Sequence, residues 1–559
     1  MVARTSDSVS AVVARLFPVI WDDAEFMAVA KPPRVNLESA AWPHGPRTID
    51  LVVDHLPKSK WAGEGGGLLP LILPERLSSG IALFARSHEA RHRFAGMATS
   101  NRLAYTHVAI VRGKPPRKRI AVKSGNEPRS RKAVKGSPAT PAATAHVEIL
   151  ATHGDLHVAR CTTKSAGLDD VRRLFKAAGG LQIVGDIRPS PYAAERRASP
   201  SRRPLVHLAG LQFPHPFKRR NVDIVDPAPK AFEAYLATNL LLEEHLRAAL
   251  AGRLALVADE DTDTFRLFTG GNEGIGGLVA DKLADAVLLE TLEGHFDGSE
   301  LQVRQIANWY QRTLGIRTVY ARHVPRRRTG AAPTSAEAHT EVLKGTPKDQ
   351  ITVHENGVRY LARFTEGWST GLFLDQRDNR RRIAELCDGK DLLNLFAYTC
   401  GFSVAAALAG ARSTTSVDLS ASNLEWGKDN FAANGLALDE HTFVRSDAFD
   451  YVKRALRQDK RYDIIVLDPP TFARAKKPRR TFEVKRHLGE LIAAAAEVLR
   501  PRGHLLISTN YRQMTPAMLR RHVEEGLGDR PHRIVLQPKL PADFAPDADY
   551  QKSLLVRVS

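Results

Sequence analysis

The sequence predicts an α/β protein with three parts: a mixed, mostly β N-terminal domain, a small α/β central domain, and a doubly wound, Rossmann-like sheet at the C-terminus. Short apolar runs alternate with helix-like segments between residues 391 and 472, which is the pattern of a parallel sheet with crossover helices. Strand-like runs separated by Pro and Gly fill residues 11–228. At 559 residues the chain is too long for one core. We therefore expect domains over 1–228, 229–348 and 349–559.

Acidic residues stand at the ends of the predicted C-terminal strands. The first apolar run, from Asp391, breaks at residues 399–401 and continues into an Ala-rich helix. The next runs end at Asp418 and just before Ser446 and Asp447. The run 462–467 is typical of a strand buried on both faces and ends in Asp468. Because open α/β sheets bind ligands at the carboxyl ends of their strands, these acids are expected to share one site.

The residue types at these ends favour a nucleoside cofactor without a pyrophosphate. The position of Asp418 after the first turn suits an acceptor for ribose hydroxyls, in nicotinamide and S-adenosylmethionine (SAM) enzymes alike. The turn offers only Gly401, although a pyrophosphate cradle needs several glycines, and SAM has no phosphate. In the loop Asp468-Pro469-Pro470-Thr471-Phe472, the carboxylate and carbonyls can accept a base's amino protons and Phe472 can stack on the base. Together these features favour methyl transfer to a nucleobase.

This region resembles the class I SAM-dependent 23S rRNA methyltransferases over roughly residues 255–559. The matching motifs are residues 370–380, 393–399, 410–420, 424–426 and 468–472. These motifs are most similar to those of the guanine-N7 half of the RlmK/RlmL family, and the cytosine-C5 RlmI family is a second relative. The resemblance implies that the cofactor is bound by Asn394, Phe396, Tyr398, Gly401, Asp418, Ser446, Asp447 and Asp468. It implies that the base is held by Asp468, Pro469, Pro470 and Phe472.

The choice between guanine N7 and cytosine C5 depends on a thiol. Methylation at C5 needs a cysteine thiolate to add to the ring first, whereas N7 already carries a lone pair. In the C5 relatives the nucleophile lies in a Ser-Cys-Ser turn, where this chain has Ser508-Thr509-Asn510. Cys400 lies in the cofactor turn and Cys387 precedes the first strand, so neither is placed for this step. Guanine N7 is the favoured target, and rRNA cytosine C5 is the alternative.

Composition indicates a nucleic-acid partner in a reducing compartment. The formal net charge is +19 and the sequence pI about 9.9, an excess that suits RNA, such as 23S rRNA or a ribosomal precursor. Three scattered cysteines exclude a disulfide scaffold, and no His or Cys spacing indicates a metal. No run of apolar residues is long enough to span a membrane. A soluble, unprocessed cytoplasmic protein is expected.

The N-terminal region resembles the RluA-type pseudouridine synthases, with an eroded active site. The segments that carry the resemblance are residues 17–32, 75–86, 179–186 and 207–216. Where that family has its catalytic Asp this chain has Glu75, and His107 stands where the family has a Tyr. Of a later signature of that family, which falls at residues 167–173, this chain keeps only Gly167 and Arg173. Because a carboxylate displaced by one methylene can lose its attack geometry, we expect an inactive, RNA-binding domain. Glu75 as an alternative catalytic acid is the competing reading, which would make the protein bifunctional.

Basic clusters mark the expected RNA contacts. They are Arg117, Lys118 and Arg119; Arg131 and Lys132; Arg326, Arg327 and Arg328; and Lys476 and Lys477. The competing reading is that each is a solvated loop without a partner. A protein of another class, a non-catalytic RNA-binding assembly factor with SAM as a structural ligand, is also compatible with the charge.

Overall fold

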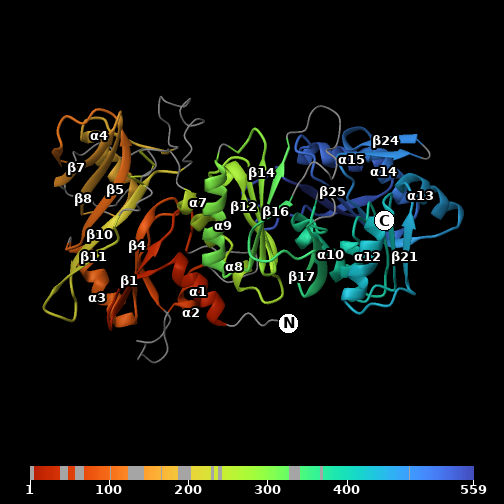
Figure 1. Cartoon of the computed structure of the whole chain (residues 1–559), viewed down its shortest axis with the longest axis horizontal. Coiled ribbons are helices and arrows are strands. Elements are labelled where there is room, and N and C mark those ends of the chain that lie inside the picture. Colours follow the sequence, from red (N-terminus) through yellow and green to blue (C-terminus); the bar gives the residue numbers. More distant parts are fainter. Residues whose placement is uncertain are drawn as a thin grey trace. The chain divides into compact units, whose positions relative to one another are not determined.

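The chain forms two compact units. The computed structural model describes residues 6–37, 48–56, 68–100, 102–123, 144–164, 166–186, 203–227, 232–233, 235–236, 242–296, 298–325, 340–364, 369–476 and 479–559 (Figure 1). The first unit comprises Met1–Ala258, Glu273–Gly276 and Gly298–Gly315. The second comprises Asp259–Asn272, Gly277–Asp297 and Ile316–Ser559.

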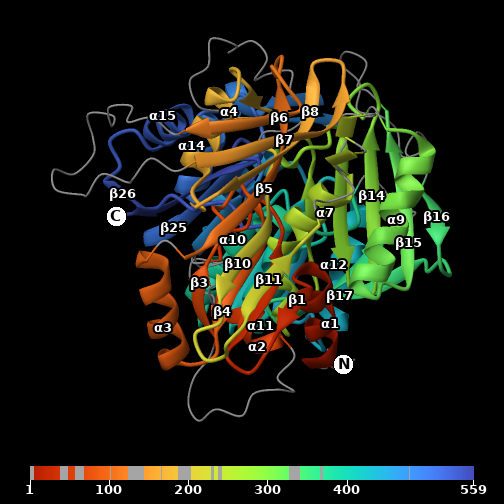
Figure 2. The same ribbon diagram turned by 90° about the vertical axis from the view of Figure 1, so that its left-hand side faces the viewer.

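The first unit is built on one mixed sheet, in keeping with the mostly β region predicted there. Its main strands follow the order β1-β2-β4-β10-β5-β8-β7-β6, and β3, β9 and β11 pair with β4, β5 and β10. The strands are β1 (Val19–Asp22), β2 (Phe26–Lys31), β3 (Leu69–Ile72), β4 (Ser79–Ala85), β5 (Ala104–Arg112), β6 (Arg119–Lys123), β7 (Thr144–His153), β8 (Leu156–Thr163), β9 (Gln182–Ile183), β10 (Val206–Pro214) and β11 (Asn221–Val225). In Figure 2, β10 lies between β4, to which it is parallel, and β5, to which it is antiparallel.

Helices of the first unit pack on this sheet and on one another. They are α1 (Ser6–Leu16), α2 (Thr48–His55), α3 (His88–Thr99), α4 (Leu168–Ala177), α7 (Leu242–Ala251), α8 (Leu254–Ala258) and α9 (Glu300–Leu314). Although α9 connects two strands of the second unit, it belongs to the first, where Arg15 Nη1 donates to the carbonyl of Thr313 at 3.0 Å. The predicted domain boundaries at 228 and 348 stay predictions.

The second unit begins with a small sheet and a hairpin. The sheet has the order β12-β13-β14-β15-β16, with β14 and β15 parallel and the other pairs antiparallel. Its elements are β12 (Thr264–Thr269), η1 (Gly270–Glu273), β13 (Leu278–Leu283), β14 (Ala286–Leu292), β15 (Thr318–Val324) and β16 (Thr340–Lys344). The hairpin of β17 (Gln350–Glu355) and β18 (Val358–Arg363) follows.

The C-terminal part of the second unit is a seven-stranded sheet of order β21-β20-β19-β22-β25-β27-β26. Its strands are β19 (Asp391–Leu395), β20 (Ser413–Asp418), β21 (His441–Arg445), β22 (Tyr462–Leu467), β25 (Leu499–Thr509), β26 (His532–Leu536) and β27 (Lys552–Val558). The elements η2 (Leu374–Gln376) and α10 (Arg377–Leu386) precede β19. Between the strands lie α11 (Gly401–Leu408), α12 (Ala421–Ala433), α13 (Ala448–Arg457), α14 (Val484–Glu497), α15 (Pro516–Leu527) and the hairpin β23 (Phe472–Lys476) and β24 (Arg479–Glu483). The chain order reverses between β19 and β22, which is the position where open sheets bind ligands.

Strand alternation explains why this sheet carries helices on both faces. Leu392, Ile464 and Leu506 point to one face and form a core with side chains of α10 and α11. Their neighbours Leu393 and Ile465 point to the other face and pack with α13, α14 and α15. Because successive strand residues face opposite sides, a strand buried on both faces needs an unbroken apolar run, which is what the sequence supplies.

Candidate functional site

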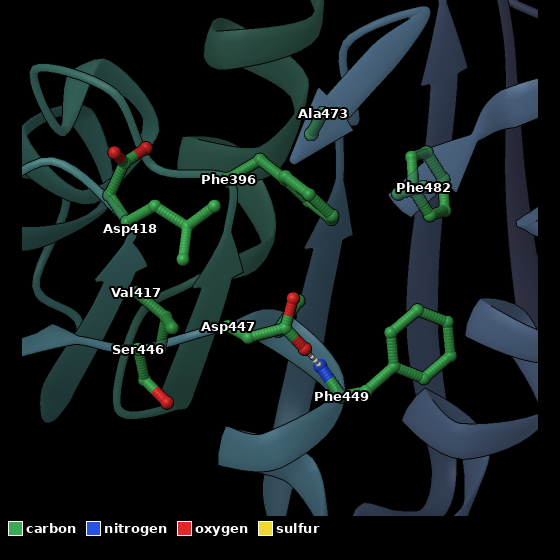
Figure 3. Close-up of a pocket in the computed structure, with 10 residues that line it drawn as sticks. Phe396, Val417, Asp418, Ser446, Asp447, Phe449, Ala473 and Phe482 are labelled. Atoms are coloured by element: carbon green, nitrogen blue, oxygen red, sulfur yellow. Dashed lines mark hydrogen bonds between the residues drawn. The ribbon is translucent and has the colours of Figure 1, made fainter. Parts of the chain in front are cut away.

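A pocket of about 370 Å³, including space open to solvent, lies at the carboxyl ends of the parallel strands. It is lined by Phe396, Val417, Asp418, Leu419, Ser446, Asp447, Ala448, Phe449, Ala473 and Phe482 (Figure 3). Asp418 pairs with Arg445 across β20 and β21, and the Ser446 amide donates to the Asp418 carbonyl at 3.1 Å. The acids at 418 and 447 therefore lie at the same edge of the sheet, as the sequence predicts.

The turn after β19 has an unusual backbone. Phe396, Tyr398 and Cys400 have φ values of 61°, 50° and 62°, in the left-handed region that residues with a Cβ rarely adopt. Such conformations cost about 1–3 kcal/mol each and persist where the surroundings impose them. Here the Tyr398 amide donates to Asp418 Oδ2 at 2.9 Å, so the turn is tied to the acid on the next strand.

Tight packing behind this turn gives a stability prediction. A Cβ at Gly427 of α12 would lie 2.4 Å from Cys400 Sγ, whereas a Cβ at Gly96 of α3 would meet nothing within 4 Å. We expect Gly427→Ala to lower the free energy of unfolding by about 1–3 kcal/mol through overpacking. The matched control Gly96→Ala should be neutral or stabilising by up to about 1 kcal/mol, since Ala favours helix. Denaturant unfolding measures both, and equal stabilities would contradict the packing argument.

Asp418 is held in place by the backbone around it. Its Oδ1 accepts the Ser420 amide at 2.8 Å and Asn423 Nδ2 at 3.3 Å. Burial raises the pKa of this carboxyl, and the hydrogen bonds from Ser420 and Tyr398 oppose that effect. A carboxylate has about four acceptor positions, so the bonds from Tyr398, Ser420 and Asn423 leave one position on Oδ2 for a ribose hydroxyl.

Asp447 and three aromatic rings shape the opposite part of the pocket. Asp447 Oδ1 accepts the Phe449 amide at 2.9 Å and caps α13, as the dashed line in Figure 3 shows. The ring of Phe482 lies 5.6 Å from Phe396 and 6.4 Å from Phe449, between ring centroids. Flat apolar walls with an acid at the rim suit a purine whose amino group donates to a carboxylate.

The Asp468 loop follows β22 at the same edge. Leu467 pairs with Leu395 on one side and Ile507 on the other, which places Asp468 beside the turn at Phe396. Burial, and then the nearby carboxyl of Asp375, raise the pKa of Asp468 to about 7. Phe472, which is 44% exposed, precedes the pocket residue Ala473. An acid and an exposed aromatic ring are thus brought next to the pocket.

Four of the predicted cofactor residues line the pocket and four do not. Asn394 is buried, and its Nδ2 donates to Ser403 Oγ at 3.0 Å. The Tyr398 hydroxyl lies 2.9 Å from Ser369 Oγ, and the Gly401 carbonyl accepts the Tyr360 hydroxyl at 3.0 Å. The fourth, Asp468, lies at the neighbouring strand end.

Sequence reasoning missed the hydrophobic lining of the pocket and the hairpin that completes it. The missed lining residues are Val417, Leu419, Ala448, Phe449, Ala473 and Phe482. Phe449 could have been found, because it directly follows the predicted Ser446-Asp447 strand end. That hairpin is formed by β23 and β24, which pair antiparallel with Phe472 opposite Glu483. The available signal was that the apolar residues Phe472, Ala473 and Phe482 flank the basic run.

The predicted RNA-binding residues are only partly within the described chain. Arg117, Lys118 and Arg119 are exposed, and Arg119 Nε donates to Glu148 at 2.9 Å. Lys476 ends β23. The predicted residues Arg131, Lys132, Arg326, Arg327, Arg328 and Lys477 lie outside the described residues.

The residues predicted for an eroded isomerase site have structural partners. Glu75 is exposed, and its Oε1 accepts the Leu168 amide, the first of α4, at 3.2 Å. Arg173, on the same helix, forms an ion pair with Asp170. His107 is buried in β5, and burial lowers its pKa to about 4.

One group of side chains in the described chain, Asp23, Glu25 and His215, has a geometry that could hold a metal ion. Lys218 Nζ lies 3.0 Å from Glu25, and Arg220 Nη2 lies 3.3 Å from Asp23. His215 Nδ1 accepts the Phe217 amide at 3.1 Å, so Nε2 carries the proton donated to Asp23 at 2.8 Å. The group is therefore an ion-pair cluster, whose cations are Lys218 and Arg220.

Among the described helices, none is long and apolar enough to cross a membrane.

Comparison with known proteins covers the region that contains this site. The family model for S-adenosylmethionine-dependent methyltransferases matches residues 266–557. The Bacillus subtilis protein named "Putative ribosomal RNA large subunit methyltransferase YwbD" is 31% identical over 321 residues, which is 56% of this chain and 79% of that protein. A structure described as "a putative methyltransferase complexed with SAH" has a TM-score of 0.51 and 31% identity, over 57% of this chain and 81% of that one.

Two relatives with more specific names match over shorter spans. The ribosomal RNA large subunit methyltransferase K/L of Acinetobacter baumannii (strain AYE) is 43% identical over 33% of this chain. The corresponding methyltransferase K of Neisseria meningitidis serogroup B (strain MC58) is 40% identical over 30% of this chain. The chain spans 25% and 48% of the length of these two relatives.

Proposed function

Because this chain belongs to the S-adenosylmethionine-dependent methyltransferase family, we propose that it methylates a base in ribosomal RNA, and specifically guanine N7 in 23S rRNA. The relatives' names support rRNA as the substrate, and the net charge of +19 suits a polyanion. In this proposal SAM supplies the methyl group, Asp418 accepts the ribose hydroxyls and Asp447 accepts the adenine amino group. The reaction takes place in the cytoplasm, where ribosomes are assembled.

The state of the cysteines carries the choice of N7 over cytosine C5. All three cysteines of the sequence are in the described chain, and all are buried. Burial raises the pKa of Cys161, Cys387 and Cys400 to about 12 each. A C5 enzyme needs an accessible thiolate, and these thiols stay protonated at neutral pH. Guanine N7 can attack the methyl sulfonium through its own lone pair, so orientation suffices.

Asp468 gives the proposed site its preference for guanine. Guanine carries two adjacent donors, N1–H and the exocyclic N2–H, which one carboxylate can accept together. Cytosine offers only the N4 amino group as a donor beside the acceptor N3. Phe472 and the carbonyls of Pro469 and Pro470 complete the base-holding surface in this proposal.

The N-terminal unit is proposed to bind RNA without isomerase activity. One carboxylate oxygen of Glu75 accepts the first amide of α4 and so caps this helix. His107 is buried and uncharged at neutral pH, because its pKa is lowered to about 4. The exposed Arg117, Lys118 and Arg119 support contact with phosphates.

Mapping modified nucleosides tests both parts of the proposal. In rRNA from a strain lacking this gene, we expect one 7-methylguanosine to be lost and every pseudouridine to be kept. Complementation with the wild-type gene or with Glu75→Ala should restore the methyl group equally. A lost 5-methylcytidine would overturn the N7 assignment, and a pseudouridine restored by the wild type but not by Glu75→Ala would make the enzyme bifunctional. Unchanged rRNA would favour the non-catalytic assembly factor.

A further inference from the structure

A buried polar network lies behind Asp468. Its members are Gln376 at the end of η2, Asn379 in α10, Ser508 in β25, Gln551 just before β27 and Ser553 in β27, and all five are buried. The network joins η2 and α10 to β25 and β27, and none of its members lines the pocket. Because buried polar groups are costly unless they are paired, so large a group requires a reason.

The hydrogen bonds of this network converge on the Ser508 hydroxyl. Gln551 Nε2 donates to Ser508 Oγ and Ser553 Oγ, both at 2.5 Å. Asn379 Nδ2 donates to Gln376 Oε1 at 2.7 Å and to Ser553 Oγ at 2.9 Å. Gln376 Nε2 donates to Ser508 Oγ at 2.7 Å. Ser508 Oγ thus accepts from the amides of Gln376 and Gln551 and, at 3.2 Å, from the Ser553 hydroxyl, so the proton of Ser508 itself is left for a further acceptor.

That proton has an acceptor in Asp468. Leu467 pairs with Ile507, so Asp468 and Ser508 are neighbours on adjacent parallel strands. The side chains of Ser508 and Gln376 act on the Asp468 carboxyl as hydrogen-bond donors that lower its pKa. Gln376 therefore uses its second amide proton on Asp468, and the network ends there with two donors.

Charges around Asp468 make its protonation state sensitive to these two donors. Burial and the carboxyl of Asp375 on η2 raise the pKa of Asp468, while Ser508, Arg380 of α10 and Gln376 lower it, and the result is about 7. Arg380 is itself paired with Glu355 of β17 at 2.6 Å. Asp375 also has a pKa raised by burial, to about 6, with Arg380 and Arg266 lowering it and Asp543 raising it. Near neutral pH, a small loss of stabilisation would protonate Asp468.

We propose that Ser508 and Gln376 are positioning residues, which fix one face of Asp468 and keep its carboxylate as the acceptor for the N–H groups of the target base. This inference rests on the proposed function. The two donors hold the carboxyl from behind, on the side of the network, so its other acceptor positions face the base. A neutral Asp468 would present an O–H to the donor edge of guanine and lose the base.

Titration of the carboxyl tests the positioning role without any RNA. The pKa of Asp468 is measured on the full chain by infrared difference titration, wild type minus Asp468→Asn. Loss of a hydrogen bond to the charged form is expected to raise this pKa by about one pH unit in Ser508→Ala. Gln376→Leu, which removes the other donor, should raise it likewise if Ser508→Ala does not fold. The control Thr414→Val removes a buried hydroxyl at the far end of β20, bonded to His441, and should leave the pKa unchanged. An unchanged pKa in a folded Ser508→Ala or Gln376→Leu would overturn the proposal.

The pH dependence of methyl transfer tests the link to the base. At saturating SAM, kcat/KM for rRNA should rise as pH passes through about 7 in the wild type, and about one unit higher in Ser508→Ala. At pH 7 the variant should be about fivefold slower and should recover near pH 9.5. A deficit that is the same at every pH would show a structural effect and contradict positioning. Wild-type protein that methylates no rRNA would overturn the proposed function alone, since the titration decides the role of Ser508 independently.

Discussion

Asp468→Asn is expected to lower kcat for methyl transfer by at least about 100-fold while RNA affinity stays within about threefold. The substitution keeps the shape of the side chain but replaces one acceptor oxygen with an amide donor. That donor would face the N–H groups of the base, and would also meet Ser508 and Gln376, which donate to this carboxyl. Single-turnover kinetics with saturating SAM measures the chemical step, and filter binding measures RNA affinity.

A matched control exists on the surface of the same sheet domain. Asp459 has a side chain that is 90% exposed and is paired only at the surface with Arg461. Asp459→Asn makes the same chemical change and should leave kcat unchanged. Full activity in Asp468→Asn would remove the acid from the proposed mechanism and favour a base held by the loop carbonyls alone.

Asp418→Ala is expected to weaken SAM binding by about 100-fold. A hydrogen bond to a charged acceptor contributes about 1.5–3 kcal/mol, and a ribose hydroxyl would form one such bond with Asp418. The substitution also releases the amides of Tyr398 and Ser420, so the left-handed turn beside the pocket loses its tie. Asp418→Asn keeps one acceptor oxygen, so its affinity for SAM should lie between those of the wild type and Asp418→Ala. Calorimetric titration with SAM gives the three dissociation constants.

The control for this prediction lies at the opposite end of the neighbouring strand. Asp391 begins β19, where Arg500 Nη1 lies 2.8 Å from its carboxylate. Asp391→Asn should reduce stability but leave the SAM dissociation constant unchanged. Because burial raises the pKa of Asp418 and bound hydroxyls favour its carboxylate, SAM affinity should also fall with decreasing pH before ordinary aspartates protonate. An affinity independent of both residue 418 and pH would contradict the assignment.

The strand ends were predictable because they depend on short-range patterns. The run 462–467 matches β22, and the acids at 418, 447 and 468 follow their strands as expected. An apolar run of the right length specifies a buried strand, and parallel strands bring their carboxyl ends to one edge. The cofactor and the family followed from the residues at those ends.

Side-chain direction was harder to predict than position. Asn394 lies on the strand beside the site, yet its amide points to Ser403 on helix α11 and not into the pocket. Phe482 belongs to a hairpin whose return strand packs back on Phe396, a contact across many residues that no local periodicity reveals. The network behind Asp468 joins residues 376, 508 and 551, which meet only when the sheet is assembled. Sequence patterns report which face a strand buries, and they do not report these long-range pairings.

The antiparallel strand β27 has a consequence for synthesis of the protein. It lies between β25 and β26 and brings Ser553 into the sheet, beside Gln551. While the chain emerges from the ribosome, one edge of β25 stays unpaired until residues 552–558 are exposed. Unpaired strand edges are prone to aggregate. Chaperone dependence of the nascent chain should therefore end only when this strand has emerged and paired with β25.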